Sequence, residues 1–109
     1  MKILSRKDEL VLLAVWRLQD NAYGVPILKH IIKNADTDWS LGTIYDTLDR
    51  LADWDYVTSY QSDPTPERGG KSKRYFKITN EGIKALKYIK KVQESMWLGL
   101  LSREKELNI

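Results

Sequence analysis

The sequence predicts a mostly α-helical fold with a small β hairpin, which places it in the α+β class. Three observations predict it: three helical patterns come before residue 55, two β-prone segments then flank a loop, and one long helical pattern ends the chain. Apolar residues that recur at spacings of three and four indicate amphipathic helices, whereas alternation of apolar and polar residues indicates strands. The expected order is therefore helix, helix, helix, strand, loop, strand, helix.

The first two helices are predicted from a capping box, an apolar run and a proline. Ser5 begins the sequence SRKD, which is typical of a helix N-terminus. Residues 10–16 are apolar without a break, which indicates a helix that is buried on most sides. Asn21 and Gly24 interrupt this pattern. Pro26 then stands where the first turn of a second helix tolerates a proline.

A third helix is expected to begin after Ser40, because serine caps helix N-termini. Ile44, Leu48 and Leu51 follow at spacings that put all three on one face. The roughly opposite face is acidic and carries Asp46, Asp49 and Asp53.

The second half of the chain predicts a hairpin and a long helix. Residues 56–61 are β-prone, residues 62–70 contain two prolines and two glycines, and residues 73–78 alternate like a strand. A last helix is expected from Thr79 to about residue 101.

Two helices joined by a short polar turn and followed by a hairpin make a winged helix-turn-helix. We expect this DNA-binding unit to occupy residues 1–78. A long C-terminal dimerisation helix is expected in residues 79–109, and the two parts are expected to form a single compact domain overall.

Composition excludes several classes of function. The chain of 109 residues has no cysteine and one histidine, His30, which excludes disulfides, thiol catalysis and a multi-histidine metal site. The sequence shows no clustered acid–base pair and no cofactor loop, so we expect no enzyme activity, no cofactor and no metal. No apolar run approaches the roughly 18 residues that span a bilayer, and the N-terminus is charged where a signal peptide is apolar. We therefore expect a cytoplasmic protein with no membrane partner.

Charge is strongly segregated along the chain, although the net charge is only +3. Residues 67–77 contain five basic side chains and one acid, whereas residues 36–55 contain six aspartates and one arginine. The glycines of the basic stretch let its backbone approach a phosphate closely, and its lysines and arginines would neutralise phosphates. This stretch therefore indicates nucleic-acid contact, although a well-solvated hairpin turn would have a similar composition.

Four motifs, in the same order and spacing, resemble those of the PadR family of bacterial winged-helix transcriptional regulators, in its short form. The motifs are Tyr23-Gly24, the sequence LGTIY at 41–45 with Leu48 and Leu51, the sequence GKSKRYFKIT at 70–79, and Gly82 with Leu86. One position departs from the family pattern, because Asp55 stands where a glycine is expected before the first strand. Aspartate tolerates a left-handed backbone better than most residues, so we expect the turn to be kept.

The resemblance implies a homodimer that binds double-stranded DNA at a palindromic operator and regulates transcription, usually as a repressor. It also implies that the last helix, often with the first, makes the dimer interface. Some short members resemble drug sensors that bind flat aromatic ligands between tryptophans at the dimer centre. The operator sequence and the regulated genes do not follow from the resemblance.

DNA contacts are expected from the start of the second helix, the flanks of the third helix and the wing. Free N–H groups at a helix N-terminus bind phosphates, and lysine and arginine side chains hold the backbone of DNA. The expected DNA-binding residues are Tyr23, Gly24, Ser40, Thr43, Tyr45, Thr47, Arg50, Lys71, Lys73 and Arg74.

The last helix independently predicts self-association. Its apolar residues cover more than half of a helical wheel, which is wider than a helix needs to pack on its own small domain, so the excess should meet a partner. The expected dimer interface comprises Leu86, Ile89, Val92, Met96, Trp97 and Leu100. A candidate pocket for a small aromatic ligand comprises Trp16, Met96 and Trp97, although tryptophans more often simply fill an interface.

The acidic third helix supports an alternative function. Carboxylates repel phosphates, although an aspartate can accept a hydrogen bond from the amino group of cytosine. Three aspartates on the outer face would therefore weaken DNA binding if they faced the groove. The alternative is a winged-helix module that binds a protein and has weak or no operator affinity.

Overall fold

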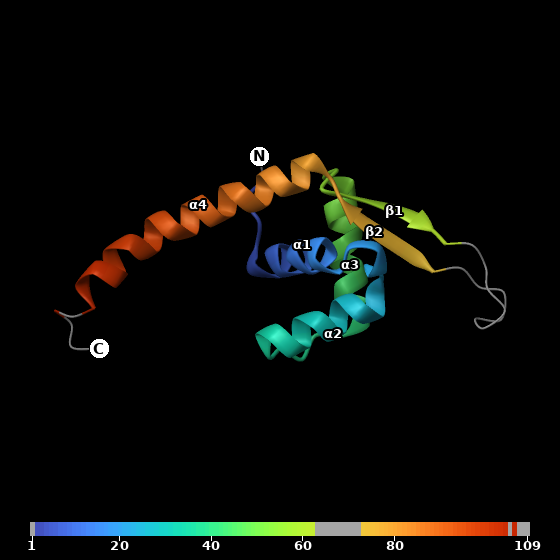
Figure 1. Cartoon of the computed structure of the whole chain (residues 1–109), viewed down its shortest axis with the longest axis horizontal. Coiled ribbons are helices and arrows are strands. Elements are labelled where there is room, and N and C mark those ends of the chain that lie inside the picture. The colour runs from blue at the N-terminus through green and yellow to red at the C-terminus, as the bar shows by residue number, and fades with distance from the viewer. Residues whose placement is uncertain (1, 63–72, 105, 107–109) are drawn as a thin grey trace.

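The computed structural model describes residues 2–62, 73–104 and 106 of the chain. The elements are α1 (Arg6–Leu18), the short 3-10 helix η1 (Gln19–Asn21), α2 (Gly24–Ala35), α3 (Leu41–Asp53), β1 (Val57–Gln61), β2 (Arg74–Ile78) and α4 (Asn80–Arg103). This order confirms the predicted mostly helical fold with one hairpin, and the helix and strand boundaries differ from the predicted ones by one or two residues (Figure 1). Most of the predicted loop between the strands lies outside the described residues.

Side-chain caps begin three of the helices. The Ser5 hydroxyl oxygen accepts from the backbone N–H of Asp8, and the Asp8 carboxylate accepts from the backbone N–H of Ser5, both at 3.1 Å. Ser40 and Thr79 cap α3 and α4 in the same position. Each cap joins residues three apart, so its partners are close in the sequence and a local pattern can predict it.

The hydrophobic core lies where α1, α2, α3 and the hairpin meet. Each element turns its apolar stripe inward, as the spacing of apolar residues predicts. The first turns of α4 close the same core with Ala85 and Ile89. The buried core includes Val11, Leu12, Val15, Ile27, Ile31, Ile44, Leu48, Leu51, Val57 and Phe76.

The hairpin is joined to the start of α2 through its backbone. The two strands pair antiparallel, with Tyr60 opposite Tyr75. On the other side of β2, the N–H of Phe76 donates to the Ala22 carbonyl at 2.8 Å, and Tyr23 forms an isolated β-bridge with Tyr75. Strand β2 is therefore held between β1 and the segment that leads into α2.

Two backbone positions shape the path from α3 to α4. Asp55 has a φ of 62°, the left-handed conformation that was expected where the family has glycine. Gly82 lies so close to the turn before β1 that a Cβ atom there would stand 2.3 Å from the Tyr56 carbonyl oxygen. Only glycine permits that approach, so Gly82 fixes where α4 crosses the end of the hairpin.

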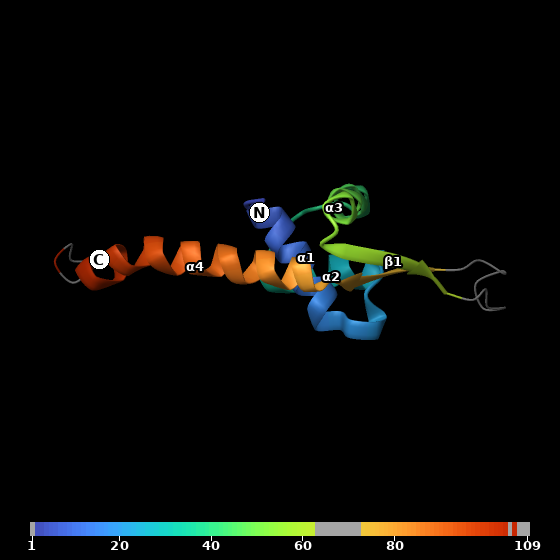
Figure 2. The same cartoon turned by 90° about the horizontal axis from the view of Figure 1, so that it is seen from above.

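The chain is elongated because α4 projects beyond the rest of the fold. Its principal extents are 62 × 28 × 20 Å. Seen from above, α4 and the hairpin extend in opposite directions from the three N-terminal helices (Figure 2). None of the helices in the described part of the chain is long and apolar enough to cross a bilayer.

Candidate nucleic-acid interface

The N-terminus of α3 carries two neighbouring hydroxyl groups. The Ser40 hydroxyl oxygen accepts from the backbone N–H of Thr43 at 3.2 Å and lies 3.2 Å from the Thr43 hydroxyl oxygen. Ser40 is exposed and Thr43 is half-buried. A helix N-terminus has a partial positive charge and unpaired N–H groups, so this end of α3 offers donors suited to a phosphate.

Tyr45 and Gly24 also come together, but as a packing contact. A Cβ atom at residue 24 would lie 2.5 Å from the Tyr45 hydroxyl oxygen. The half-buried Tyr45 ring therefore lies against the first turn of α2, and Gly24 itself is buried. Gly24 of the YG motif thus lets α2 and α3 pack closely, because any larger residue there would displace the tyrosine ring.

A group of aromatic rings with one lysine forms the base of the wing. The Tyr60 and Tyr75 rings stack with centroids 5.6 Å apart, and the Tyr23 ring meets Tyr75 edge-on at 5.3 Å. The Lys73 ammonium lies 4.3 Å from the Tyr23 ring centroid and donates to the Tyr23 hydroxyl at 3.2 Å. This places a cation beside the start of α2, held by cation–π attraction and a hydrogen bond. Tyr60 and Tyr75 were not among the expected site residues. The alternation of the two strands and the pairing of these residues across the hairpin could have predicted that their rings lie together.

The outer face of α3 is acidic, as the sequence predicted. Asp46, Asp49 and Asp53 are all exposed. One of them is paired with the wing, because the Arg74 guanidinium lies 3.0 Å from the Asp49 carboxylate. The Arg74 guanidinium also lies 4.8 Å from the Phe76 ring centroid.

Thr47 was expected to contact DNA, and the structure corrects that expectation. Its side chain is 1% exposed, and its hydroxyl donates to the Thr43 carbonyl at 2.9 Å. Thr47 stands three residues after Ile44 and four before Leu51, so it shares their buried face. The sequence already showed this spacing, but the hydroxyl group of Thr47 led to its placement on the flank of the helix.

Arg50 was also expected at the groove, and its DNA contact stays a prediction. In this structure its half-exposed side chain makes an ion pair. Its guanidinium donates to the buried carboxylate of Asp8 in α1 and lies 5.6 Å from the Trp54 ring centroid. Burial alone would raise the pKa of Asp8, but the Arg50 and Ser5 hydrogen bonds outweigh it and hold that pKa below its usual value. Asp8 and Arg50 are 42 residues apart, so no local pattern predicts their pairing.

Lys71 lies outside the described residues, so its expected DNA contact stays a prediction. The basic residues of the wing that the structure describes are Lys73, Arg74 and Lys77. Lys73 lies beside Tyr23, Arg74 beside Asp49, and Lys77 on the other face of β2 from Phe76, by strand alternation.

The expected interface residues of α4 divide into two groups. Ile89 is 7% exposed and belongs to the core, and Leu86 is half-buried against it. Further along the helix Met96 is 77% exposed and Trp97 is 52% exposed. Val92 and Leu100 are exposed as well. The unpartnered apolar surface therefore lies in the C-terminal half of α4.

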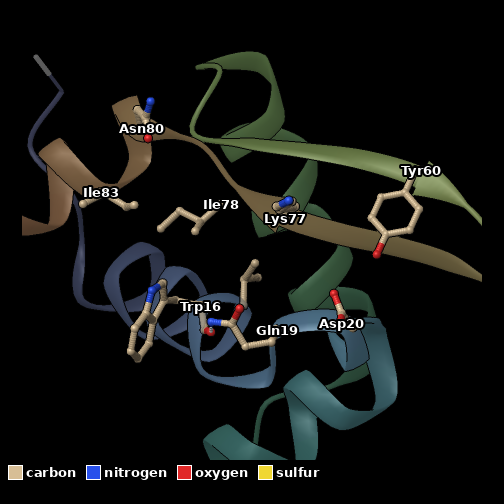
Figure 3. Close-up of a pocket in the computed structure, with 9 residues that line it drawn as sticks. Trp16, Gln19, Asp20, Tyr60, Lys77, Ile78, Asn80 and Ile83 are labelled. Atoms are coloured by element: carbon tan, nitrogen blue, oxygen red, sulfur yellow. Dashed lines mark hydrogen bonds between the residues drawn. The ribbon is translucent and has the colours of Figure 1, made fainter.

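Two of the three residues of the candidate ligand pocket, Trp16 and Trp97, line different hollows in the described part of the chain. Trp16 lines a half-open cavity of about 320 Å³ beside Gln19, with Ile78 and Ile83 on the opposite side (Figure 3). Trp97 lines a different hollow with Gln93 and Glu94, both on α4. Met96 lines neither of these two hollows.

Comparison with known proteins places this arrangement in a family. Residues 12–88 match the model of the transcriptional regulator PadR-like family. Among solved structures, smu.1704 from Streptococcus mutans UA159 is similar with a TM-score of 0.70 and 24% identity, over 99% of this chain and 95% of that one. A PadR family transcription regulator from hypervirulent Clostridium difficile R20291 is similar with a TM-score of 0.66 and 22% identity, over 96% and 100%.

A more distant similarity is to a mutant of MepR from S. aureus bound to an oligodeoxyribonucleotide. Its TM-score is 0.62 and its identity 17%, over 96% of this chain and 70% of that one. At these identities the solved structures establish the fold alone. The search of curated proteins gave no significant match. The family match covers most of the chain, from α1 into α4, and the chain therefore belongs to the PadR-like family of transcriptional regulators, whose members are not enzymes.

Proposed function

We propose that this protein is a cytoplasmic, sequence-specific DNA-binding repressor that binds a palindromic operator as a homodimer. The observation that carries the proposal is the position of Lys73, whose ammonium lies against Tyr23 at the start of α2. A cation at the root of the wing and free N–H groups at the start of α3 are donors for the backbone of DNA. The MepR mutant, which has a similar fold, was solved bound to an oligodeoxyribonucleotide.

The proposed homodimer is supported by the C-terminal half of α4. Val92, Met96, Trp97 and Leu100 are exposed together on one helix that projects from the fold. A large exposed apolar surface of this kind marks an interaction site. A two-fold dimer would present two α3 helices, and two-fold symmetry in the protein matches a palindrome in the operator.

We also propose that a flat aromatic ligand relieves repression at the dimer centre. Support comes from Trp97 and Met96, which are adjacent and exposed. Trp16, also half-exposed, would join such a site only from the partner protomer, because the two tryptophans line different hollows within one chain. Quenching of tryptophan fluorescence by a planar dye, lost in Trp97→Leu and kept in Trp54→Phe, would test this part.

The alternative function is a protein-binding winged helix, and the acidic face of α3 favours it. Asp46 and Asp53 are exposed on the face that a recognition helix turns toward DNA. Their charge opposes phosphates, and desolvating them without a partner costs free energy.

One experiment separates the two functions. Duplexes with a random core are selected on the protein and sequenced, and the selected site is then titrated by fluorescence anisotropy at about 50 and 200 mM salt. We expect enrichment of a palindrome and affinity that falls steeply with salt. Lys73→Ala should weaken binding several-fold and reduce the salt slope by about one.

The matched control is Lys87→Ala, which removes the same charge from an exposed position on α4. It should leave affinity and salt slope close to those of the unchanged protein. Weak binding with no enriched sequence would reject operator recognition and favour the protein-binding module. Equal effects of the two lysine substitutions would reject the role of Lys73.

A further inference from the structure

One ion pair joins the proposed recognition helix to the wing. The Arg74 guanidinium at the start of β2 donates to the Asp49 carboxylate of α3 at 3.0 Å. The two side chains are 37% and 58% exposed. The Phe76 ring lies beside the guanidinium, with its centroid 4.8 Å away. The cation is therefore held at one position, between an acidic helix and the wing.

The position of this pair puts Asp49 in competition with DNA. Asp49 shares the exposed face of α3 with Asp46 and Asp53, and Arg74 is one of the wing cations proposed to hold a phosphate. Phosphate and carboxylate oxygens accept hydrogen bonds from the same N–H donors at the edge of a guanidinium. An exposed ion pair contributes only about 0–1 kcal/mol, so a phosphate can displace Asp49. The displaced carboxylate is then left unpaired near a polyanion.

We propose that Asp49 limits non-specific DNA binding by competing with DNA phosphates for Arg74. This inference rests on the proposed DNA-binding function and adds a residue that acts against it. In the free protein Asp49 neutralises Arg74, so the wing presents one cation fewer to DNA of arbitrary sequence. Non-specific affinity depends mainly on the number of phosphates neutralised, so this pair lowers it directly.

The test is the affinity for a duplex of arbitrary sequence, measured by fluorescence anisotropy at several salt concentrations. Asp49→Asn keeps the shape of the side chain and removes its charge. We expect it to raise that affinity about two- to fivefold at low salt and to steepen the salt slope by about one phosphate. In an Arg74→Gln background the same substitution should lose most of this gain, because no guanidinium remains to be released.

The matched control is Asp53→Asn, which removes the same charge from the same face of α3 one turn further along. This control measures the general effect of a less acidic helix. We expect it to raise the affinity for DNA by a smaller factor, and by the same factor in the Arg74→Gln background. Circular dichroism and the thermal unfolding midpoint confirm that each variant is folded. Asp49→Ser provides a second neutral variant if the asparagine protein is unstable.

Three results would overturn the inference. Weaker binding in Asp49→Asn would mean that Asp49 positions Arg74 for DNA rather than competing with it. Equal gains in the Asp49 and Asp53 variants, both kept without Arg74, would leave only a general charge effect. Binding that is unchanged in Asp49→Asn would show that Asp49 does not compete for Arg74. If neither the unchanged protein nor Asp49→Asn binds DNA, the proposed function itself is rejected, which is a separate result.

Discussion

The two ends of α4 carry similar apolar side chains in opposite surroundings. At the first turns Ala85 is fully buried and Ile89 nearly so, because both belong to the core and α1 packs against α4. Toward the other end Met96, Trp97 and Leu98 are at least half exposed. The N-terminal part of α4 therefore completes the core of its own chain. Its C-terminal part exposes apolar side chains that nothing in the described part of the chain covers. Burial is decided by what the rest of the chain reaches, rather than by the composition of the helix.

Of the substitutions considered, alanine in place of glycine should show the largest difference between the two ends of α4 in the free energy of unfolding. A Cβ atom at residue 82 would meet the Tyr56 carbonyl oxygen at 2.3 Å, whereas one at residue 99 would meet nothing within 4 Å. We expect Gly82→Ala to lower the free energy of unfolding by about 3 kcal/mol or more, through a backbone clash that cannot relax cheaply. Gly99→Ala should be neutral or stabilise by up to about 1 kcal/mol, since alanine favours helix.

Urea unfolding followed by circular dichroism measures both changes. Equal losses at the two positions would mean that the projecting half of α4 is already packed against something in solution. A harmless Gly82→Ala would contradict the close crossing of α4 over the turn before β1.

Removing a large apolar side chain from the exposed half of α4 should act on assembly rather than on the fold. We expect Trp97→Ala to weaken the proposed dimer by about 100-fold or more, as tryptophans commonly do at the centre of an interface. The thermal unfolding midpoint at low protein concentration should change little, because Trp97 takes no part in the described core. Sedimentation equilibrium over a range of concentrations measures the dissociation constant.

Lys91→Ala is the control for Trp97→Ala, because it truncates an exposed side chain on the same helix. It should leave the dissociation constant within a few-fold of the original. A protein that stays monomeric at millimolar concentration without any substitution would contradict the interface outright.

Loss of the buried Asp8 charge should have a smaller, pH-dependent effect on the body of the fold. The pKa of Asp8 is lower in the folded state than in the unfolded chain, mainly because Arg50 and Ser5 oppose the effect of burial. Ionised Asp8 therefore stabilises the fold at any pH above its unfolded pKa of about 3.9, and this stabilisation is lost as pH falls through the lower folded pKa. We expect Asp8→Asn to cost about 1–3 kcal/mol at pH 7.

The cost of Asp8→Asn should shrink as pH falls from 5 toward 2, which urea unfolding at a series of pH values would show. Asp20→Asn is the comparison, since Asp20 is an exposed residue of η1. A pH-independent cost would mean that the lost hydrogen-bond geometry, rather than the charge, accounts for the effect.

The elements of this protein were predictable because their signals are local. The caps at Ser5, Ser40 and Thr79 each join residues three apart, and the inner faces of the helices follow the spacing of their apolar residues. The left-handed turn at Asp55 was also expected from its place in the family pattern. Local geometry alone determines such features, so the sequence contains all the information needed to predict them.

The contacts between elements decided how the candidate site residues are paired. Arg50 has the charge of a DNA ligand, but α1 brings the buried Asp8 to it across 42 positions. Arg74 is one wing cation among several in the sequence, yet only folding sets it beside Asp49. Charge and hydroxyl content by themselves indicated that residues 40–77 contain most of the candidate interface. Which of those charged groups are paired was decided by tertiary packing, because an ion pair between distant residues depends on distances that no sequence spacing encodes.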